Sequence, residues 1–413
     1  MQWLKEIPSH WEERKMKYCF SERSEKNHPD EPILCATQSQ GVIPQSMYAN
    51  RVVVVNKGFE GLKLVKEGDF VISLRSFEGG IEYAYYQGII SAAYTVLQPN
   101  SSSFSNYWKI LFKSHPFIQL LQTCVTGIRE GQNINYSMLC RAFLPLPPLS
   151  EQKQIVRYLE DKTSKIDAYV SEKEKEILLL QELKQKTIAD AVTKGLNPDV
   201  KTKDSGISWI GEIPEHWEVK RVGSFLRERK EKYNGDNTLG ILSLLKGLGI
   251  IPYEEKGNIG NKAKEDLSTY KIARKGDVVV NCMNVIIGSS GITDYDGYIS
   301  PAYYSFIPID RMMAIIYKHW LSLPQMQGAI RCMAKGILEI RLRVSSQQLL
   351  SMKIPFPPLD EQRAIVSYIE EKCQKIDKLA SELQSEIDYL KEYKQRLIAD
   401  CVTGQVNVQK EVT

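Results

Sequence analysis

Residues 144–152 read Leu-Pro-Leu-Pro-Pro-Leu-Ser-Glu-Gln, and residues 354–362 read Ile-Pro-Phe-Pro-Pro-Leu-Asp-Glu-Gln. After the first copy, residues 151–194 contain neither proline nor glycine. The prolines end the preceding segment. Ser150 and Asp360 are expected to be helix N-caps, because their side-chain oxygens can accept bonds from the first free backbone amides. The pattern therefore predicts a long helix after each copy, about 60 Å in length.

The apolar residues of both predicted helices follow the spacing of a coiled-coil seam. The predicted seam residues are Ile155, Leu159, Ile166, Tyr169, Ile177 and Leu180, with Lys173 and Thr187 as polar interruptions, and Ile365, Ile369, Ile376, Leu379, Leu383, Ile387, Leu390 and Leu397. A helix with a single apolar stripe must bury that stripe against another element. Because each helix offers the other the same stripe, we expect an antiparallel pair with one globular module at each end. The charged residues on the other faces are expected to be solvated.

The repeat extends over nearly the whole chain. Residues 3–11 (Trp-Leu-Lys-Glu-Ile-Pro-Ser-His-Trp) recur at 209–217 as Trp-Ile-Gly-Glu-Ile-Pro-Glu-His-Trp, and Gly68-Asp69 recurs as Gly276-Asp277. Residues 88–94 match residues 297–303 in the same way. Because the offset drifts only from 206 to 210 residues, the chain contains two copies of one module.

The predicted organisation has four parts: 1–149 and 201–359 are globular domains, while 150–200 and 360–413 contain the long helices. Short β-branched runs at 52–55, 70–74 and 277–280 predict strands. Residues 115–123 and 312–321 predict short helices. The expected fold class is α+β: two similar α/β domains separated by two long helices that form an antiparallel coiled coil, with an internal pseudo-twofold repeat. The sequence does not order the strands.

The composition is that of an ordinary globular protein, with 413 residues, 43% apolar residues and 25% charged residues. The net charge is +4, and the positive excess lies outside the two helical segments. No apolar run approaches the length of a membrane span, and the N-terminus lacks the apolar core of a secretory signal. The eight cysteines are scattered without a Cys-x-x-Cys pair, so we expect reduced thiols in a cytoplasmic protein and no metal site.

The two copies of Pro-Pro-Leu-x-Glu-Gln before an Ile/Val-rich helix, together with residues 203–217, resemble the specificity subunit of type I restriction–modification enzymes over essentially the full length. The resemblance implies that the globular domains are target recognition domains and that the helices are conserved spacers. It implies double-stranded DNA as ligand, with modification subunits that methylate adenine using S-adenosylmethionine. It also implies restriction subunits that use ATP and Mg²⁺, and no cofactor in this chain.

The motifs of two enzyme classes are missing from the sequence. There is no Asn/Asp-Pro-Pro-Tyr/Phe segment for a flipped adenine, no Gly-x-Gly-x-x-Gly after a strand, and no phosphate-binding P-loop. A nuclease-like Pro198-Asp199 with Glu218 and Lys220 has no counterpart in the first copy. His10 and His216 are expected to be structural, and no catalytic residue is predicted. The alternatives are a stand-alone methyltransferase or nuclease, and a scaffold with degenerate recognition domains.

Candidate DNA-binding residues lie in loops after strands, where the two copies differ, because polar side chains on exposed edges can bond to bases and phosphates. They are Gln40, Arg75, Ser76, Tyr94 and Arg129 in the first domain, and Lys246, Asn281, Asn284, Tyr303, Lys335, Arg341 and Arg343 in the second. Candidate partner-binding residues lie in the repeated motif, because two like surfaces suit two modification subunits. They are Pro147, Pro148, Glu151 and Gln152, and Pro357, Pro358, Glu361 and Gln362.

Overall fold

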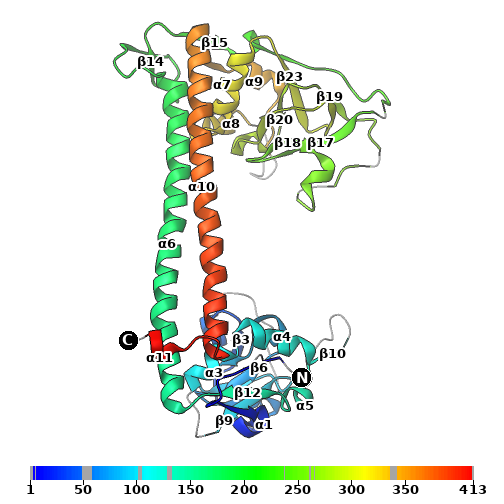
Figure 1. Cartoon of the computed structure of the whole chain (residues 1–413). Helices are drawn as coiled ribbons and strands as arrows, with labels where there is room; N and C mark the ends of the chain where they lie inside the picture. Colours follow the sequence, from blue (N-terminus) through cyan, green and yellow to red (C-terminus); the bar gives the residue numbers. More distant parts are fainter. Residues whose placement is uncertain are drawn as a thin grey trace. The chain divides into compact units, whose positions relative to one another are not determined.

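The computed structural model describes residues 3–4, 6–48, 58–100, 105–127, 133–236, 238–259, 262–264, 266–334 and 342–411. Contacts divide the chain into two units (Figure 1). The first combines Met1–Glu174 with Gln384–Thr413, and the second is Lys175–Leu383. Each unit therefore contains one globular domain and a segment of both long helices. The boundaries expected from the sequence separate domains from helices instead, and they stay a prediction.

The first domain is built around a four-stranded antiparallel sheet with the order β2-β9-β6-β7. Phe70 on β6 pairs with Leu97 on β9. The strands are β1 (Glu12–Lys15), β2 (Phe20–Arg23), β3 (Leu34–Thr37), β4 (Gly41–Pro44), β5 (Lys63–Val65), β6 (Phe70–Ile72), β7 (Glu82–Tyr83), β8 (Gly88–Ile90), β9 (Thr95–Pro99), β10 (Val125–Thr126), β11 (Asn133–Ile134) and β12 (Phe143–Leu146). The helical segments are α1 (Met16–Cys19), η1 (Gln45–Met47), η2 (Phe59–Gly61), α2 (Ser76–Gly79), α3 (Ser105–Leu111), α4 (His115–Thr123) and α5 (Tyr136–Leu139).

The second domain repeats this order as β16-β23-β20-β21 and adds a second four-stranded sheet, β18-β17-β22-β19, in which β17 and β22 are parallel. The strands are β13 (Thr202–Asp204), β14 (Glu212–Pro214), β15 (Glu218–Arg221), β16 (Leu226–Glu228), β17 (Gly240–Leu245), β18 (Gly249–Pro252), β19 (Lys271–Ala273), β20 (Val278–Asn281), β21 (Ser290–Ile292), β22 (Gly297–Ile299), β23 (Tyr303–Pro308) and β24 (Lys353–Phe356). The helical segments are η4 (Val222–Ser224), η5 (Tyr253–Lys256), η6 (Asn284–Ile287), α7 (Arg311–Ser322), α8 (Pro324–Met333) and α9 (Ser346–Ser351).

Most of the short elements predicted from the sequence are present. The helix predicted at 115–123 is α4, and the one predicted at 312–321 is α7 with one more residue at each end. The strands predicted at 70–74 and 277–280 correspond to β6 and β20. The strand predicted at 52–55 lies outside the described residues.

Aromatic side chains fill the core between the first sheet and the helices α3 and α4. The ring centroids of Phe20 and Trp108 are 5.4 Å apart, and those of Phe70 and Phe112 are 5.2 Å apart in an edge-to-face arrangement. All four residues are almost completely buried. Large rings in this geometry supply much of a core's apolar burial. The antiparallel sheet and its covering helices are therefore held by one continuous core.

The two long helices are α6 (Leu149–Lys194) and α10 (Leu359–Val402), as the absence of proline and glycine predicted. Their starts correct one expectation. The carbonyl of Pro148 accepts from the amide of Gln152, and that of Pro358 accepts from Gln362. The helices therefore begin at Leu149 and Leu359, two residues before the starts that caps at Ser150 and Asp360 would give. Ser150 and Asp360 lie inside the first turn, and their assignment as N-caps is wrong.

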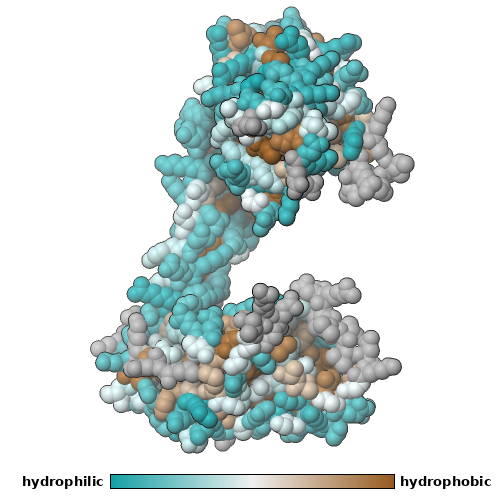
Figure 2. All heavy atoms as spheres, turned by 90° about the vertical axis from the view of Figure 1, so that its right-hand side faces the viewer, coloured by the Kyte–Doolittle hydropathy of each residue, from teal (hydrophilic) through white to brown (hydrophobic). Residues whose placement is uncertain are grey.

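The helices α6 and α10 pair in antiparallel fashion. In the first unit, Lys394 contacts Asp167 at 2.7 Å and Lys391 contacts Glu174 at 3.0 Å. The residue number therefore rises along α10 in the direction in which it falls along α6. In the second unit, Lys184 contacts Asp377 at 2.6 Å. The surface of these helices is mostly hydrophilic (Figure 2). The predicted solvated faces and antiparallel coiled coil are confirmed.

The seam between the helices is incomplete. Leu383 and Ile387 are buried as predicted. Leu379 and Tyr169, also predicted seam residues, are both 41% exposed, and the Tyr169 hydroxyl instead donates a hydrogen bond to Glu386. The assignment of these two residues to a buried seam is therefore wrong.

Each domain packs against the start of one long helix and the end of the other. In the first unit, Ile155 and Leu159 at the start of α6 share a buried cluster with Cys401 and Val402 at the end of α10. The Tyr107 hydroxyl lies in this cluster and donates to the carbonyl of Val402. The second unit repeats the arrangement with the end of α6 and the start of α10. Residues at both ends of the chain therefore contribute to the first domain's core.

Candidate nucleic-acid interface

The two repeated sequence motifs meet at the junction between domain and helix. In the first unit, His10 Nε2 lies 2.8 Å from Glu151 Oε2. In the second unit, His216 Nε2 lies 2.5 Å from Glu361 Oε1, and the Trp217 indole donates to Glu361 Oε2 at 2.8 Å. The two histidines therefore have the structural role that the sequence predicted.

The same junction changes the interpretation of the predicted partner-binding residues. Gln152 and Gln362 are 1% exposed. The side-chain amide of Gln152 donates to the carbonyl of Pro147, and that of Gln362 donates to the carbonyl of Pro357. Pro147, Pro357 and Glu151 are also buried. These side chains hold each domain to its helix, a role that the sequence did not predict. Of the predicted partner-binding residues, Pro148 and Pro358 are exposed and Glu361 is half-exposed. A direct partner contact stays a prediction for these three.

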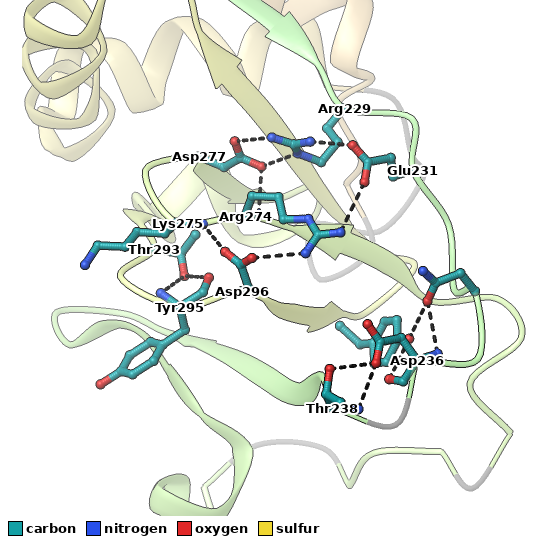
Figure 3. Close-up of polar contacts among 12 residues, drawn as sticks. Arg229, Glu231, Asp236, Thr238, Arg274, Lys275, Asp277, Thr293, Tyr295 and Asp296 are labelled. Carbon is teal, nitrogen blue, oxygen red and sulfur yellow. Dashed lines mark hydrogen bonds and ion pairs between the residues drawn. The ribbon is translucent and has the colours of Figure 1, made fainter.

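A buried ion pair explains the repeated Gly-Asp segment. Arg23 on β2 donates two bonds to Asp69, at 2.7 and 3.2 Å. Arg229 donates two matching bonds to Asp277, at 2.5 and 3.0 Å (Figure 3). The hydrogen bond to Asp277 raises the pKa of the Arg229 guanidinium above its ordinary value. Bidentate pairs of this kind fix geometry as well as charge. In each domain, the ion pair therefore fixes the end of the outer strand to the turn that precedes the central strand.

The ion pair of the second domain belongs to a wider network. Arg274 donates to Asp296 at 3.0 Å and lies 3.7 Å from Glu231, which also contacts Arg229 (Figure 3). Bonds from the Lys275 amide and from Arg274 lower the pKa of Asp296. This network occupies the turns at the Asp277 end of β20, so the candidate loops at its other end extend from a fixed strand.

In the first domain, Gln40 and Arg75 are exposed, as a DNA contact requires. Gln40 lies in the β3–β4 turn, where its amide donates to Thr37 Oγ1. Tyr94 is half-buried against the core, and burial raises its pKa. Ser76 is 2% exposed, and its hydroxyl accepts from the amide of Ser73 at 2.8 Å. Ser76 is therefore a turn residue with a buried side chain, and its assignment as a DNA contact stays a prediction.

In the second domain, Lys246, Asn281, Asn284 and Tyr303 line one cleft of about 470 Å³. They come from the β17–β18 turn, the end of β20, η6 and the start of β23. Lys246 and Asn284 are exposed, Tyr303 is half-buried and Asn281 is 7% exposed. The fold thus brings together three predicted residues from positions where the two sequence copies differ and one, Tyr303, from a position where they match.

The remaining predicted residues are more scattered. Arg343 is exposed beside Tyr304 and Gln348, in a separate hollow. Arg129, Lys335 and Arg341 lie outside the described residues. Sequence reasoning missed Lys262, which lines the cleft. The available signal was a lysine at the end of the Gly- and Asn-rich segment 257–262.

Among the described residues, no group of three or more His, Cys, Asp or Glu side chains could hold a metal ion. Glu218 and Lys220, of the nuclease-like pattern, form an exposed ion pair of 2.7 Å. In the same part of the chain, no helix is both long and apolar enough to cross a membrane.

Comparison with known proteins places these features in a family. The family model described as "Type I restriction modification DNA specificity domain" matches residues 8–179 and again residues 214–389. The MjaVIII specificity subunit of Methanocaldococcus jannaschii is 26% identical over 369 residues, which are 84% of this chain and 81% of that protein. The EcoBI specificity subunit of Escherichia coli is 26% identical over 281 residues, 64% of this chain and 59% of that protein.

Solved structures share the fold. A chain from a study of complex assembly and conformational transition of the type I R-M system has a TM-score of 0.70 at 17% identity, covering 97% of this chain and 100% of its own. The HsdS subunit of Thermoanaerobacter tengcongensis has a TM-score of 0.55 at 18% identity, covering 97% and 99%. Since the family model matches twice and covers most of the sequence, the chain belongs to the type I restriction–modification DNA specificity family.

Proposed function

We propose that the two domains read the two unlike halves of an asymmetric, bipartite DNA target. As a specificity subunit, the chain recognises DNA sequence and is not the catalytic component. The observation that carries the proposal is the cleft, which gathers Lys246, Asn281 and Asn284 from separate segments of the second domain. Amide and ammonium donors in one place suit the acceptor groups of bases and phosphates.

Two different half-sites are supported by the differences between the domains. The ends of β6 and β20 are matched, but Ser73 and Ser76 stand in the first domain where Asn281 and Asn284 stand in the second. The β3–β4 turn carries Gln40, whereas the β17–β18 turn carries Lys246. Two domains with one strand order and different polar side chains at the same edge are suited to read different sequences.

The spacing of the two half-sites follows from duplex geometry. Two domains that contact the same face of the duplex require half-site centres roughly 10–10.5 bp apart, one helical turn. If each domain covers about 3–5 bp, the unread gap is about 5–8 bp. The long helices, which join the domains along the chain, would then set this gap.

Two modification subunits per chain are the proposed partners, with restriction subunits added for cleavage. They would methylate adenine with S-adenosylmethionine and cut DNA with ATP and Mg²⁺, all bound outside this chain. The two domain–helix junctions support the number two, because Leu149 and Leu359 are 48% and 49% exposed at matched places beside Pro148 and Pro358. Exposed apolar residues that cluster are typical of interfaces. Native mass spectrometry of the co-expressed proteins should find two modification subunits per chain, and a single one with both junctions intact would contradict the proposal.

DNA selection is tested by binding with and without the chain. A labelled pool of randomised duplexes is incubated with the modification subunits alone or together with the full-length chain, and bound duplexes are sequenced. We expect one bipartite sequence to be enriched only when the chain is present. Enrichment of the same sequence by the modification subunits alone would contradict the proposed function.

A further inference from the structure

The cleft of the second domain has a polar floor. Asn281 lies there with only 7% of its surface exposed, and Ser289, 3% exposed, also lines the cleft. Leu242, Leu244 and Tyr303 line the cleft as well and belong to the buried cluster or pack against it. A mostly buried polar side chain at the base of an open cleft is held in one place and can bond to a ligand that enters the cleft.

One half of the Asn281 side chain is already used. Its Oδ1 accepts from the amides of Met283 at 3.1 Å and Asn284 at 3.4 Å. Asn281 is therefore a positioning residue for the turn that carries Asn284. Among the described residues, no hydrogen-bond partner contacts its Nδ2, and the residue lines the cleft. The floor thus offers an amide donor rather than an acceptor.

Cationic side chains lie around this donor. Lys246 and Lys262 are exposed and line the same cleft. The segment that carries Lys262 is fixed by two phenols, because the Tyr253 hydroxyl accepts from the Ala263 amide at 2.8 Å and the Tyr270 hydroxyl accepts from the Lys264 amide at 3.2 Å. Neither Asp nor Glu is among the described residues that line the cleft. A site with ammonium groups, an amide donor and no carboxylate is complementary to oxygen or nitrogen acceptors that are neutral or negative.

In the first domain, a lysine side chain spans the region that corresponds to this cleft. There, the β3–β4 turn and α2 are bridged by Lys113, which donates to the carbonyls of Gln38 at 3.3 Å and Gly79 at 2.9 Å, and to Glu82 at 2.5 Å. The Gln38 side chain would also lie 2.8 Å from a Cβ built on Gly79. In the second domain the corresponding turn and η6 both line the open cleft. The two domains therefore differ in shape as well as in side chains.

We infer that the second domain grips its half-site inside this cleft, with the amide of Asn281 donating to an acceptor atom of one nucleotide. The acceptor belongs either to a base edge or to a phosphate, since both present the same chemistry. The first domain contacts its half-site with protruding side chains such as Arg75 instead. This inference rests on the proposed function and assigns the contact of one domain within it.

The substitution Asn281→Asp tests the donor. It keeps an oxygen for the two backbone amides, and it replaces the Nδ2 donor by a second oxygen. The matched control is Gln325→Glu, the same amide-to-carboxylate change at an exposed residue of α8 that does not line the cleft. Both variants are made in the full-length chain, assembled with its modification subunits, and measured by fluorescence anisotropy on the duplex enriched by the wild-type complex and on single-base variants of that duplex.

We expect Asn281→Asp to weaken binding to the enriched duplex about tenfold or more relative to Gln325→Glu. If the acceptor is a base edge, the loss depends on the base at one position of one half-site. If it is a phosphate, all sequences lose equally, and a methylphosphonate at one position reproduces the loss in the wild type. Equal affinities for the two variants would overturn the inference.

Two further arms keep the test decisive. If Asn281→Asp does not assemble, Asn281→Ser replaces it, because serine keeps an acceptor oxygen, lacks the amide donor and is the residue at the matched place of the first domain. The same loss is expected. If the wild-type complex itself enriches no bipartite sequence, the proposed function fails. If it does, and neither variant at 281 differs from the control, only the cleft assignment fails.

Discussion

Replacing Asp277 by asparagine removes the charge at the centre of the second domain's ion-pair network. Asp277 is 2% exposed and accepts four hydrogen bonds, of which those from Arg229 Nε, the Ser305 hydroxyl and the Arg274 amide converge on Oδ2. An asparagine supplies one oxygen and turns an NH₂ group toward these donors. The Arg229 guanidinium, 13% exposed, would remain buried without its counter-charge. Breaking a buried pair on one side costs about 3–5 kcal/mol.

The assay is native-state hydrogen exchange followed by mass spectrometry, because it reports each domain separately. A loss of about 3 kcal/mol should speed exchange in peptides from β20 and β23 more than a hundredfold. Peptides from β6 and β9, with the intact Arg23–Asp69 pair, serve as the internal reference. The control Glu231→Gln removes a half-exposed carboxylate that contacts the same Arg229, and it should cost no more than about 1 kcal/mol.

A double variant separates charge from shape. Adding Arg229→Met to Asp277→Asn removes the unpaired guanidinium, so part of the lost protection should return. Unchanged exchange in β20 after Asp277→Asn, or equal effects of Asp277→Asn and Glu231→Gln, would refute the conclusion that this pair rigidifies the domain. A double variant that exchanges faster than Asp277→Asn alone would show that packing of the arginine stem matters more than its charge.

Three other predictions concern recognition, spacing and pH. Arg75→Ala should cost about 1–3 kcal/mol and relax one half-site only; methylation of duplexes altered in one half at a time measures this, and an equal loss for all sequences would make Arg75 a phosphate contact or a fold residue. Deleting about four residues from both long helices should shorten the gap by about two base pairs, since the helices lose about 6 Å, and leave both half-sites unchanged; an unchanged gap in a folded variant argues against the helices as spacers. Burial, assisted by Lys318 and Lys184, lowers the pKa of His319 to about 4. On acidification, His319 therefore binds a proton at a higher pH in the unfolded chain than in the folded one. The second domain should keep its full free energy of unfolding above about pH 6.5 and lose up to about 3 kcal/mol of it as the pH falls toward 4. Urea titrations across this range should show a flatter profile for His319→Gln, and an unchanged profile would count against the assignment.

The long helices could be predicted closely because their signals are local. Continuous helix formers, flanking prolines and the apolar spacing lie within each segment, and α4 was predicted by the same logic. The starts of α6 and α10 still differ from the expected ones by two residues, because the carbonyl of Pro148 or Pro358 rather than a side chain begins the helical bonding. Strand order was out of reach, since β9 pairs with β2 and β6 far away in sequence, and no local pattern encodes that choice.

The candidate site was predicted in part, because comparison of the two copies locates positions but not environments. Lys246, Asn281 and Asn284 were found at places where the repeats differ, and the fold brings them together. Nothing in the sequence showed that Ser76 is buried, or that Glu151 turns inward to His10. Those facts depend on which repeated segments face each other, a tertiary property. The distinction between an open cleft and a closed turn has the same origin.

Methylome sequencing of the host with and without this gene tests the central claim most directly. The account predicts methylated adenines that disappear on deletion and that lie in one bipartite sequence, with two unlike halves and an unread gap of about 5–8 bp. The halves should differ because the matched loops of the two domains carry different side chains. A methylated target that is a continuous palindrome, or a methylome that does not change on deletion, would contradict it.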